Sequence, residues 1–192
     1  MRRRSIATPR LVLRRLTVDD LDLLARENPG AGQVSEAARR WVEASHGIDP
    51  RDGGAWAMVH RIRRQTVGAV MYFAVQPGAA REISYVTAAR WRRRGLGGEA
   101  VAAVLTHLFD EVGLQEVSAD VAIDNDASIG LLQKFGFTPS PIPAPGLTVG
   151  LDRQVAARWG LDARTWSDVR GRQVSPSRED LPCPTPSGAG LP

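Results

Sequence analysis

The stretch R-R-R-G-L-G-G-E-A at residues 92–100 lies between a strand-like segment at 82–86 and the most periodic helical segment of the chain, at 101–112. Its three glycines remove Cβ atoms, so backbone N–H groups can converge there. The N-terminus of a helix adds unpaired N–H donors and partial positive charge. The stretch therefore predicts a diphosphate site, although a plain tight loop would use the same glycines. It lacks the Gly-Lys-Ser/Thr ending of a P-loop and the Gly-x-Gly-x-x-Gly spacing of a Rossmann fold.

Short strands and helices alternate on both sides of this stretch, which predicts an α/β chain. Alternating apolar residues indicate strands, and apolar residues three or four apart indicate helices. The predicted strands cover residues 11–16, 56–62, 67–75, 82–87, 116–123 and 147–151. The predicted helices cover residues 17–26, 35–45, 101–112 and 127–135. Thr17 and Ser35 are the expected N-caps of the first two.

Composition excludes several classes of protein. The 192 residues are 43% hydrophobic and 24% charged, which is typical of a globular domain and unlike a disordered or collagen-like chain. The longest apolar stretch, at 67–75, has nine residues, whereas a bilayer span needs about 20. No export signal is visible at the N-terminus. The single cysteine, Cys183, excludes an intrachain disulfide, so we expect a cytoplasmic protein.

One domain is expected over residues 1–159. Residues 160–192 are rich in Pro, Ser and Gly and are expected to form a largely disordered tail. The net charge is +4, and Lys134 is the only lysine among 25 basic residues. Arginine pairs well with phosphate and carboxylate, but an arginine excess also follows from the base composition of coding DNA. Each arginine cluster must therefore be judged by its position.

The glycine stretch resembles the acetyl-CoA loop of the GNAT superfamily of N-acyltransferases, whose pattern is Q/R-x-x-G-x-G/A. Arg92, Gly95 and Gly97 occupy its three defining places, and the Glu-Ala at 99–100 often continues it. The glycines alone predict a general anion site, and the resemblance implies that the ligand of this site is acetyl-CoA.

Two further segments resemble the same superfamily. Residues 124–128 (D-N-D-A-S) and the Gly-Phe pair at 136–137 are similar to its N-x-x-S…G-F segment. Residues 8–14 (T-P-R-L-V-L-R) look like the start of its ribosomal-protein N-terminal acetyltransferase-like branch. The resemblance thus spans residues 8–155, with three motifs in the expected order.

The resemblance implies an α+β fold of the GNAT type, with a mixed, mostly antiparallel central sheet of six to seven strands and helices on both faces. Two central strands, here 82–87 and 116–123, would splay apart and hold the pantetheine arm of acetyl-CoA. The implied cofactor-binding residues are Tyr85, Val86, Arg92, Arg93, Arg94, Gly95, Leu96, Gly97, Gly98, Asn125 and Ser128. The other interpretation of the arginines is a solvated basic loop or a nonspecific nucleic-acid contact.

Acetyl transfer to an amine needs a group that takes a proton, because an ammonium has no lone pair. Glu82 is the predicted catalytic base, since it lies on the strand that would flank the thioester, on one face with Ser84 and Val86. GNAT enzymes often place a glutamate near this position. The alternative is a strand-edge charge paired with Arg81 or another arginine. The Val86 N–H is expected to meet the thioester oxygen.

On the leaving-group side the sequence departs from much of the superfamily. Many members carry a tyrosine acid four residues before the Gly-Phe pair, and that position here is Leu132. Ser128 is then the second predicted catalytic residue, because the resemblance gives this serine a role at the coenzyme sulfur. Capping of the helix is the alternative for Ser128, and Asn125 has the same choice between capping and binding pantetheine.

The sequence thus predicts an acetyl-CoA-dependent N-acetyltransferase that uses no metal and acts by direct attack in a ternary complex. The three histidines form no metal-ligand pair. The acceptor is expected to be a primary amine of a protein N-terminus or a small molecule, selected by residues 28–54 and 138–146. The alternative is a non-catalytic GNAT-fold module that binds acyl-CoA or nucleic acid. No membrane partner is expected, and homodimerisation is left open.

Overall fold

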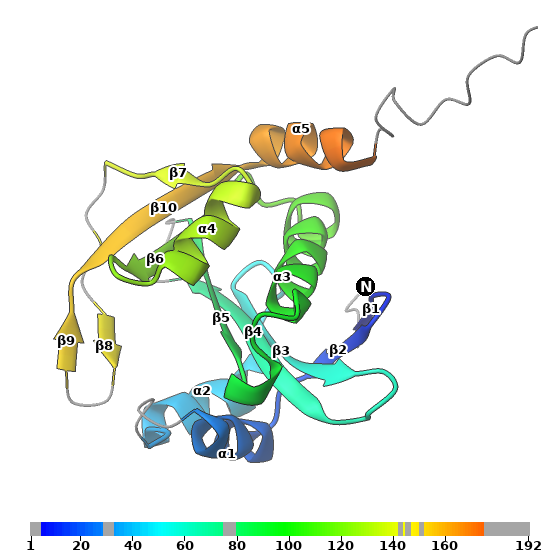
Figure 1. Cartoon of the computed structure of the whole chain (residues 1–192), viewed down its shortest axis with the longest axis vertical. Coiled ribbons are helices and arrows are strands. Elements are labelled where there is room, and N and C mark those ends of the chain that lie inside the picture. Colours follow the sequence, from blue (N-terminus) through cyan, green and yellow to red (C-terminus); the bar gives the residue numbers. More distant parts are fainter. Residues whose placement is uncertain are drawn as a thin grey trace, which may run out of the picture.

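The computed structural model describes residues 5–28, 33–74, 80–141, 144, 147–149 and 152–174, and these form one large sheet with helices packed on it (Figure 1). The strands are β1 (Ser5–Ala7), β2 (Leu11–Arg15), β3 (Gly53–His60), β4 (Thr66–Ala74), β5 (Arg81–Thr87), β6 (Glu116–Ala122), β7 (Thr138–Pro139), β8 (Leu147–Val149), β9 (Asp152–Gln154) and β10 (Ala156–Asp162). The helices are α1 (Val18–Glu27), α2 (Glu36–Ser45), the short η1 (Ala89–Trp91), α3 (Leu96–Thr106) with its π-helical continuation η2 (His107–Val112), α4 (Asp126–Lys134) and α5 (Ala163–Val174).

Eight strands form the main sheet in the order β1-β2-β3-β4-β5-β6-β10-β7. Every neighbouring pair is antiparallel except β5 and β6, which are parallel. This parallel pair is joined at two positions only, Arg81 with Val117 and Glu82 with Ser118, and then diverges (Figure 1). The predicted mixed sheet with two splayed central strands is therefore confirmed. It exceeds the predicted six to seven strands because β1 and β7 are too short to show an alternating pattern.

Helices cover both faces of the sheet. Neighbouring residues of a strand point to opposite faces. Tyr72 of β4 stacks on Trp56 of β3, with ring centroids 5.5 Å apart, and Trp56 meets His107 of η2 edge-on. Phe73, the next residue of β4, meets Trp41 of α2 with centroids 5.7 Å apart. Helix α2 therefore lies on one face, and α3 with η2 on the other.

The first two helices begin where the sequence predicts. Thr17 and Ser35 cap α1 and α2, and Thr17 forms a capping box with Asp20. Arg14 of β2 donates to both Asp20 oxygens, at 2.6 and 2.8 Å, and Thr66 of β4 donates a further bond at 2.8 Å. Burial raises the pKa of Asp20, but these hydrogen bonds outweigh it and lower the pKa to about 2. A charged carboxylate thus ties α1 to the sheet.

The C-terminal prediction is wrong for residues 160–174, which were expected to belong to a largely disordered tail. Strand β10 pairs with β6 along its whole length, so a domain boundary after residue 159 would cut the central sheet. The expected last strand at 147–151 is instead one arm of a separate two-stranded sheet formed by β8 and β9. Residues 175–192, the rest of the expected tail, lie outside the described residues.

Helix α5 escaped prediction because few of its side chains enter the core. It begins after Asp162, whose carboxylate accepts the Thr165 N–H at 2.8 Å in the manner of an N-cap. Trp166 is 2% exposed and packs near Phe109 and Phe135, with ring centroids 6.5 and 5.8 Å away. Most of the remaining side chains of α5 are polar, so the composition of this segment resembles that of a disordered tail. Trp166 nevertheless anchors the helix to the core.

Trp166→Ala is expected to lower the free energy of unfolding by about 3 kcal/mol, because it removes a large buried side chain that its neighbours cannot replace. Urea denaturation followed by circular dichroism measures the change. Ser167→Ala, at an exposed position of the same helix, is the matched control and should leave the midpoint unchanged. Equal midpoints for the two variants would show that α5 does not contribute to the stability of the sheet.

Candidate active site

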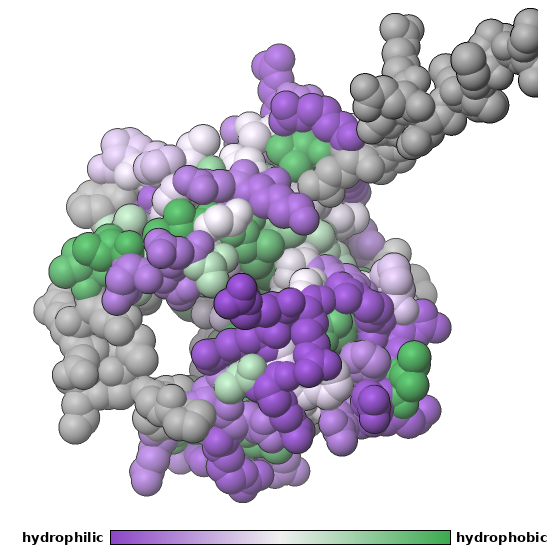
Figure 2. Space-filling view, viewed as in Figure 1, coloured by the Kyte–Doolittle hydropathy of each residue, from purple (hydrophilic) through white to green (hydrophobic). Residues whose placement is uncertain are grey.

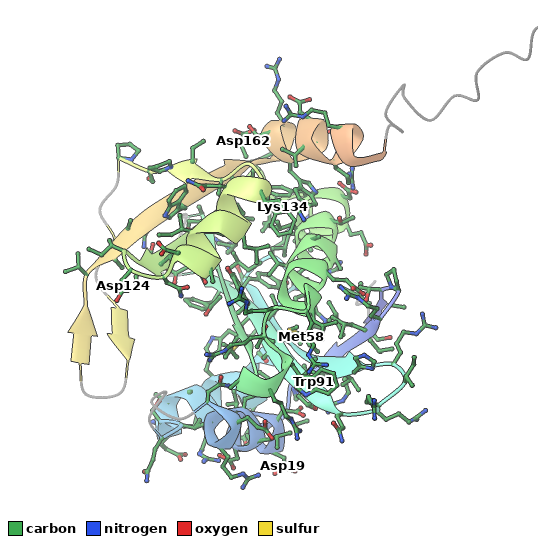
Figure 3. The ribbon with its side chains drawn as sticks, in the orientation of Figure 1. Asp19, Met58, Trp91, Asp124, Lys134 and Asp162 are labelled. Carbon is green, nitrogen blue, oxygen red and sulfur yellow. The ribbon has the colours of Figure 1, made fainter. Side chains whose placement is uncertain are left out.

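A cavity of about 640 Å³ lies beside β5, between the start of α3 and the start of α4. Its lining residues are Tyr85, Val86, Thr87, Trp91, Arg92, Arg93, Gly95, Leu96, Gly97, Gly98, Asn125, Ala127, Ser128 and Leu131. Every predicted cofactor-binding residue except Arg94 is among them. Figure 3 shows Trp91 next to the start of α3. Thr87 and Leu131 were not predicted, although period two from Tyr85 and a helical spacing of three from Ser128 point to them.

Glycines let three elements meet at this cavity. Gly95 caps α3 with a left-handed backbone, φ 72°, which favours glycine. A Cβ on Gly97 would lie 3.0 Å from Thr87 Oγ1, and a Cβ on Gly98 would lie 3.1 Å from Leu131 Cδ1. The missing side chains thus allow α3 to approach β5 and α4 closely. They also leave the first N–H groups of α3 uncovered on the cavity side.

The side chain of Arg92 is bound by the protein itself. Its guanidinium donates to Asn28 Oδ1 at 2.5 Å and to the Thr87 carbonyl at 3.2 Å. Arg90, two residues earlier, pairs with Glu27 at 3.1 Å. Both arginines therefore connect the loop to the end of α1. This structural role was not among the interpretations that the sequence offered for the arginines.

The N-terminal segment is fastened to the first turn of α3 by a set of contacts that we call the N-terminal clasp (Thr8, Arg10 and Glu99). The Glu99 carboxylate accepts hydrogen bonds from the Thr8 hydroxyl at 2.5 Å, the Arg10 N–H at 2.8 Å and Arg10 Nε at 2.6 Å. Burial raises the pKa of Glu99, but these bonds outweigh it and lower the pKa overall. Arg10 also donates to the Arg94 carbonyl at 2.8 Å, while the Arg94 guanidinium lies 5.2 Å from the Trp91 ring centre.

Glu82, Asp120 and Arg158 form a charged cluster on the opposite face of the sheet. Glu82 is paired in register with Phe73, so it points to the face that α2 covers. Arg158 of β10 donates to both Asp120 oxygens at 2.7 Å and lies 3.6 Å from Glu82 Oε2. The nearby arginine is thus Arg158 and not Arg81, which donates to Asp52 at 3.2 Å.

The environment of Glu82 shifts its protonation into the neutral range. Burial raises the pKa, the charge of Asp120 raises it further, and Arg158 lowers it, which leaves a pKa of about 7. A carboxyl group with this pKa can accept and release protons at neutral pH, as a general base must. Asp120 and Arg158 were not predicted. Period two from Ser118 would have indicated Asp120, whereas the strand of Arg158 was itself missed.

The backbone of β5 presents alternate N–H groups to its two neighbours. The Ala88 N–H donates to the Val67 carbonyl directly opposite, at 2.9 Å. Along an antiparallel ladder every second residue makes such bonds, so the Val86 N–H also points to β4. The N–H groups of Tyr85 and Thr87 point instead to the side where β6 diverges. The direction of the Val86 N–H argues against it as the donor to a thioester oxygen, although Val86 itself lines the cavity.

Tyr85 and Ser128 lie together on the α3 side of the sheet. Asn125 Oδ1 accepts the Ser128 N–H at 3.1 Å, so Asn125 caps α4. The Ser128 hydroxyl lies beside the Tyr85 phenol: burial raises the pKa of Tyr85, and the serine partly offsets this. The Tyr85 oxygen is buried and makes no hydrogen bond of normal geometry within the described residues. Leu132, at the usual tyrosine position, is fully buried in the core.

Two features of the described residues concern membranes and metal ions. Among the residues that the structure describes, no helix is both long and apolar enough to cross a membrane, and no three His, Cys, Asp or Glu side chains lie close enough to hold a metal ion. Hydrophilic side chains cover much of the region of α1 and the loop before α3 (Figure 2).

Comparison with families of known proteins agrees with this geometry. Residues 10–138 match the acetyltransferase (GNAT) domain family. The match covers more than half of the chain and includes the glycine loop and both diverging strands. The chain therefore belongs to the GNAT acetyltransferase family, and its class is that of an acyltransferase. The family prediction is confirmed.

Individual relatives are more distant. The chain is 31% identical over 86 residues to YoaA of Bacillus subtilis (strain 168), an uncharacterized N-acetyltransferase, and the match spans 44% of this chain and 49% of that protein, about half of its length. A Vibrio cholerae protein assigned as a ribosomal-protein-serine acetyltransferase aligns with a TM-score of 0.66 and 19% identity, over 82% of this chain and 97% of that chain. Mutant forms of the spermidine/spermine N-acetyltransferase SpeG from Vibrio cholerae align with a TM-score of 0.66 and 16% identity, over 86% of this chain and 99% of that chain. Both structures share the fold.

Proposed function

We propose that this protein is an acetyl-CoA-dependent N-acetyltransferase that transfers the acetyl group to a primary amine by direct attack in a ternary complex. The observation that carries the proposal is the placement of two sites on opposite faces of the splayed sheet. The cavity with the glycine loop lies on the α3 side. Glu82, with its pKa of about 7, lies on the α2 side at the last paired position of β5 and β6. The proposed compartment is the cytoplasm.

The cavity residues fit acetyl-CoA. Gly97 and Gly98 leave a space that Cβ atoms would fill, and the first N–H groups of α3 are suited to a diphosphate. Beyond Glu82, β5 pairs with no described strand on its β6 side, so its backbone groups can bond the amides of a pantetheine arm. When bound, acetyl-CoA supplies an acetyl group activated as a thioester. Tyr85 and Thr87 would offer their N–H groups to the thioester oxygen.

The charged cluster fits an amine. With Glu82 ionised, Glu82, Asp120 and Arg158 carry one net negative charge, which attracts an ammonium. Glu82 then takes the proton that the amine must lose, and releases it to solvent. Arg158 pairs with Asp120 at 2.7 Å and lies farther, 3.6 Å, from Glu82.

For a given base, the lower pKa of an α-amine makes it easier to deprotonate than an alkylamine. An N-terminal α-amine has a pKa of about 8, whereas a lysine-like amine has one of about 10.4. Proton transfer to a base with a pKa of about 7 is therefore uphill by about 1.4 kcal/mol for the first and by more than about 4 kcal/mol for the second. We propose a peptide or protein N-terminus as the acceptor, with a polyamine such as spermidine as the second candidate.

An amine panel with detection of free thiol tests the proposal. Peptides with a free α-amine should release CoA with saturation in both substrates, spermidine should react more slowly, and the same peptides blocked at the N-terminus should not react. Acetyl-CoA binding without thiol release from any amine would support the non-catalytic module. Absence of acetyl-CoA binding, together with salt-sensitive binding of an oligonucleotide, would support a nucleic-acid module.

A further inference from the structure

The Glu99 carboxylate lies in the first turn of α3, the turn whose N–H groups are proposed to hold the diphosphate of acetyl-CoA. Gly97 and Gly98 of this turn line the cavity, and Glu99 is the next residue of the chain. A carboxylate in the first turn of a helix interacts with the same partial positive charge that attracts a bound anion, and it repels that anion. An uncompensated negative charge on Glu99 would therefore weaken the diphosphate site.

Glu99 carries this charge at neutral pH. Its side chain is 14% exposed. Burial raises the pKa of Glu99, but the hydrogen bonds from Thr8 and Arg10 outweigh burial and hold the pKa below its ordinary value of 4.5. The carboxylate is thus ionised whenever the proposed reaction can run. Protonation of Glu99 cannot relieve its repulsion of a diphosphate.

Arg10 fixes a positive charge at the same end of α3. Its Nε lies 2.6 Å from Glu99 Oε2, and its backbone N–H donates to Glu99 Oε1 at 2.8 Å. Its Nη1 donates to the Arg94 carbonyl at 2.8 Å, and a Cβ on Gly95, the N-cap residue, would lie 3.3 Å from its Nη2. Both the backbone and the side chain of Arg10 therefore hold its charge beside the start of the helix.

The arginines of the loop itself do not compensate Glu99. Arg92 is hydrogen-bonded to the end of α1, and the Arg94 guanidinium lies 5.2 Å from the centre of the Trp91 ring. Among the residues that the structure describes, Arg10 is the cation paired with Glu99. The compensating charge thus comes from a segment 89 residues earlier in the chain.

We propose that Arg10 is a positioning residue of the cofactor site, which acts through Glu99. By neutralising this carboxylate, Arg10 leaves the positive end of α3 available to the diphosphate. The inference rests on the proposed function, because it requires acetyl-CoA to bind at the glycine loop. Arg10 does not line the cavity and need not contact the coenzyme. The N-terminal clasp is then part of the cofactor site in an electrostatic sense.

A charge cycle tests the proposal without turnover, with acetyl-CoA affinity measured by calorimetry at low ionic strength. Arg10→Met leaves Glu99 uncompensated and should weaken binding about tenfold, the scale of one charge close to a bound anion. Glu99→Gln removes the competing charge but keeps an oxygen for Thr8 and the Arg10 N–H, so it should bind at least as tightly as wild type. Arg10→Met combined with Glu99→Gln should return close to the wild-type affinity.

Arg40→Met is the matched control for Arg10→Met. It removes the same charge from an exposed position of α2, away from the cavity, and should leave acetyl-CoA affinity unchanged. The difference between Arg10→Met and wild type should shrink in ~1 M salt, where the Debye length is about 3 Å. Acetyl-pantetheine lacks the diphosphate, so wild type and Arg10→Met should bind it equally.

Purely structural support of the loop by Arg10 predicts different results. Equal losses in Arg10→Met and the double variant, or an equal loss of acetyl-pantetheine binding, would overturn the inference while the proposed function stands. If Arg10→Met fails to fold, as judged by circular dichroism, Glu99→Gln alone decides, because weaker acetyl-CoA binding by this variant also contradicts the proposal. A wild-type protein that binds no acetyl-CoA would instead overturn the proposed function.

Discussion

Glu82→Gln is expected to lower kcat at pH 7 by ~10²- to 10³-fold, the usual effect of removing one general base. The amide keeps the shape of the side chain and remains within reach of Arg158. Acetyl-CoA affinity should barely change, because Glu82 does not line the cofactor cavity. Steady-state kinetics with a peptide substrate and calorimetry with acetyl-CoA measure the two quantities. Glu116→Gln, an exposed carboxylate on the neighbouring strand, is the control.

The pH profile distinguishes a base from a structural carboxylate. In wild type, kcat/KM should fall about tenfold per pH unit below the Glu82 pKa of about 7, because the protonated acid cannot accept a proton. In Glu82→Gln this acidic limb should vanish, and the residual rate should rise toward the pKa of the amine as more substrate arrives neutral. Identical profiles for the two proteins would transfer the role of base to a water chain or another residue.

The same pKa predicts how Glu82 affects stability. The folded-state pKa of about 7 lies above the ordinary value of 4.5, so the native state holds a proton that the unfolded state has lost between these values. The contribution of Glu82 to the free energy of unfolding is therefore full below pH 4.5 and falls by about 1.4 kcal/mol per pH unit as the pH rises to 7. Glu82→Gln should remove this slope. Urea unfolding at pH 5 and pH 8, compared between the two proteins, checks the sign.

Gly97→Glu is expected to abolish measurable acetyl-CoA binding. The new side chain starts on a surface of the cavity, 3.0 Å from Thr87 Oγ1, and places a negative charge where the diphosphate is proposed to bind. The fold should remain, because a glutamate in the first turn of a helix interacts favourably with the helix dipole. Isothermal titration calorimetry measures the loss of affinity, and circular dichroism verifies the fold.

Two variants separate the causes. Gly97→Ala adds only the Cβ, so it should weaken binding less than glutamate does. Gly130→Glu adds the same charge to α4, at an exposed glycine whose Cβ would meet nothing within 4 Å, and it should leave affinity unchanged. Normal acetyl-CoA affinity in Gly97→Glu would place the cofactor elsewhere.

The sequence predicts elements that carry strong local signals. Thr17 and Ser35 predict where α1 and α2 begin, because an N-cap interacts only with the next few residues of the sequence. Strands β4 and β5 are apolar or alternating. The glycine loop is recognised by its resemblance to the acetyl-CoA loop of the family, and nearly all the cofactor residues that this resemblance implies line one cavity.

The sequence does not predict contacts between segments that lie far apart in the chain. Arg158 reaches Glu82 only because β10 returns beside β6, and the arginine and the glycine of β10 conceal its alternating pattern. The link from Arg92 to Asn28 joins residues 64 apart, with no pattern in either segment. Helix α5 depends on Trp166, a single large side chain in a polar stretch. Each of these three features depends on tertiary packing, which the local sequence pattern does not predict.

The N-terminal clasp has a consequence for the order in which the chain folds during synthesis. Thr8 and Arg10 bond to Glu99, which lies 91 and 89 residues further along. A ribosome adds ~5–20 residues per second, so the first segment emerges roughly 5–18 s before its partner. Until then the Glu99 carboxylate, which holds this segment against α3, has not been made. The loop before α3 can therefore acquire its final support only after Glu99 has been made.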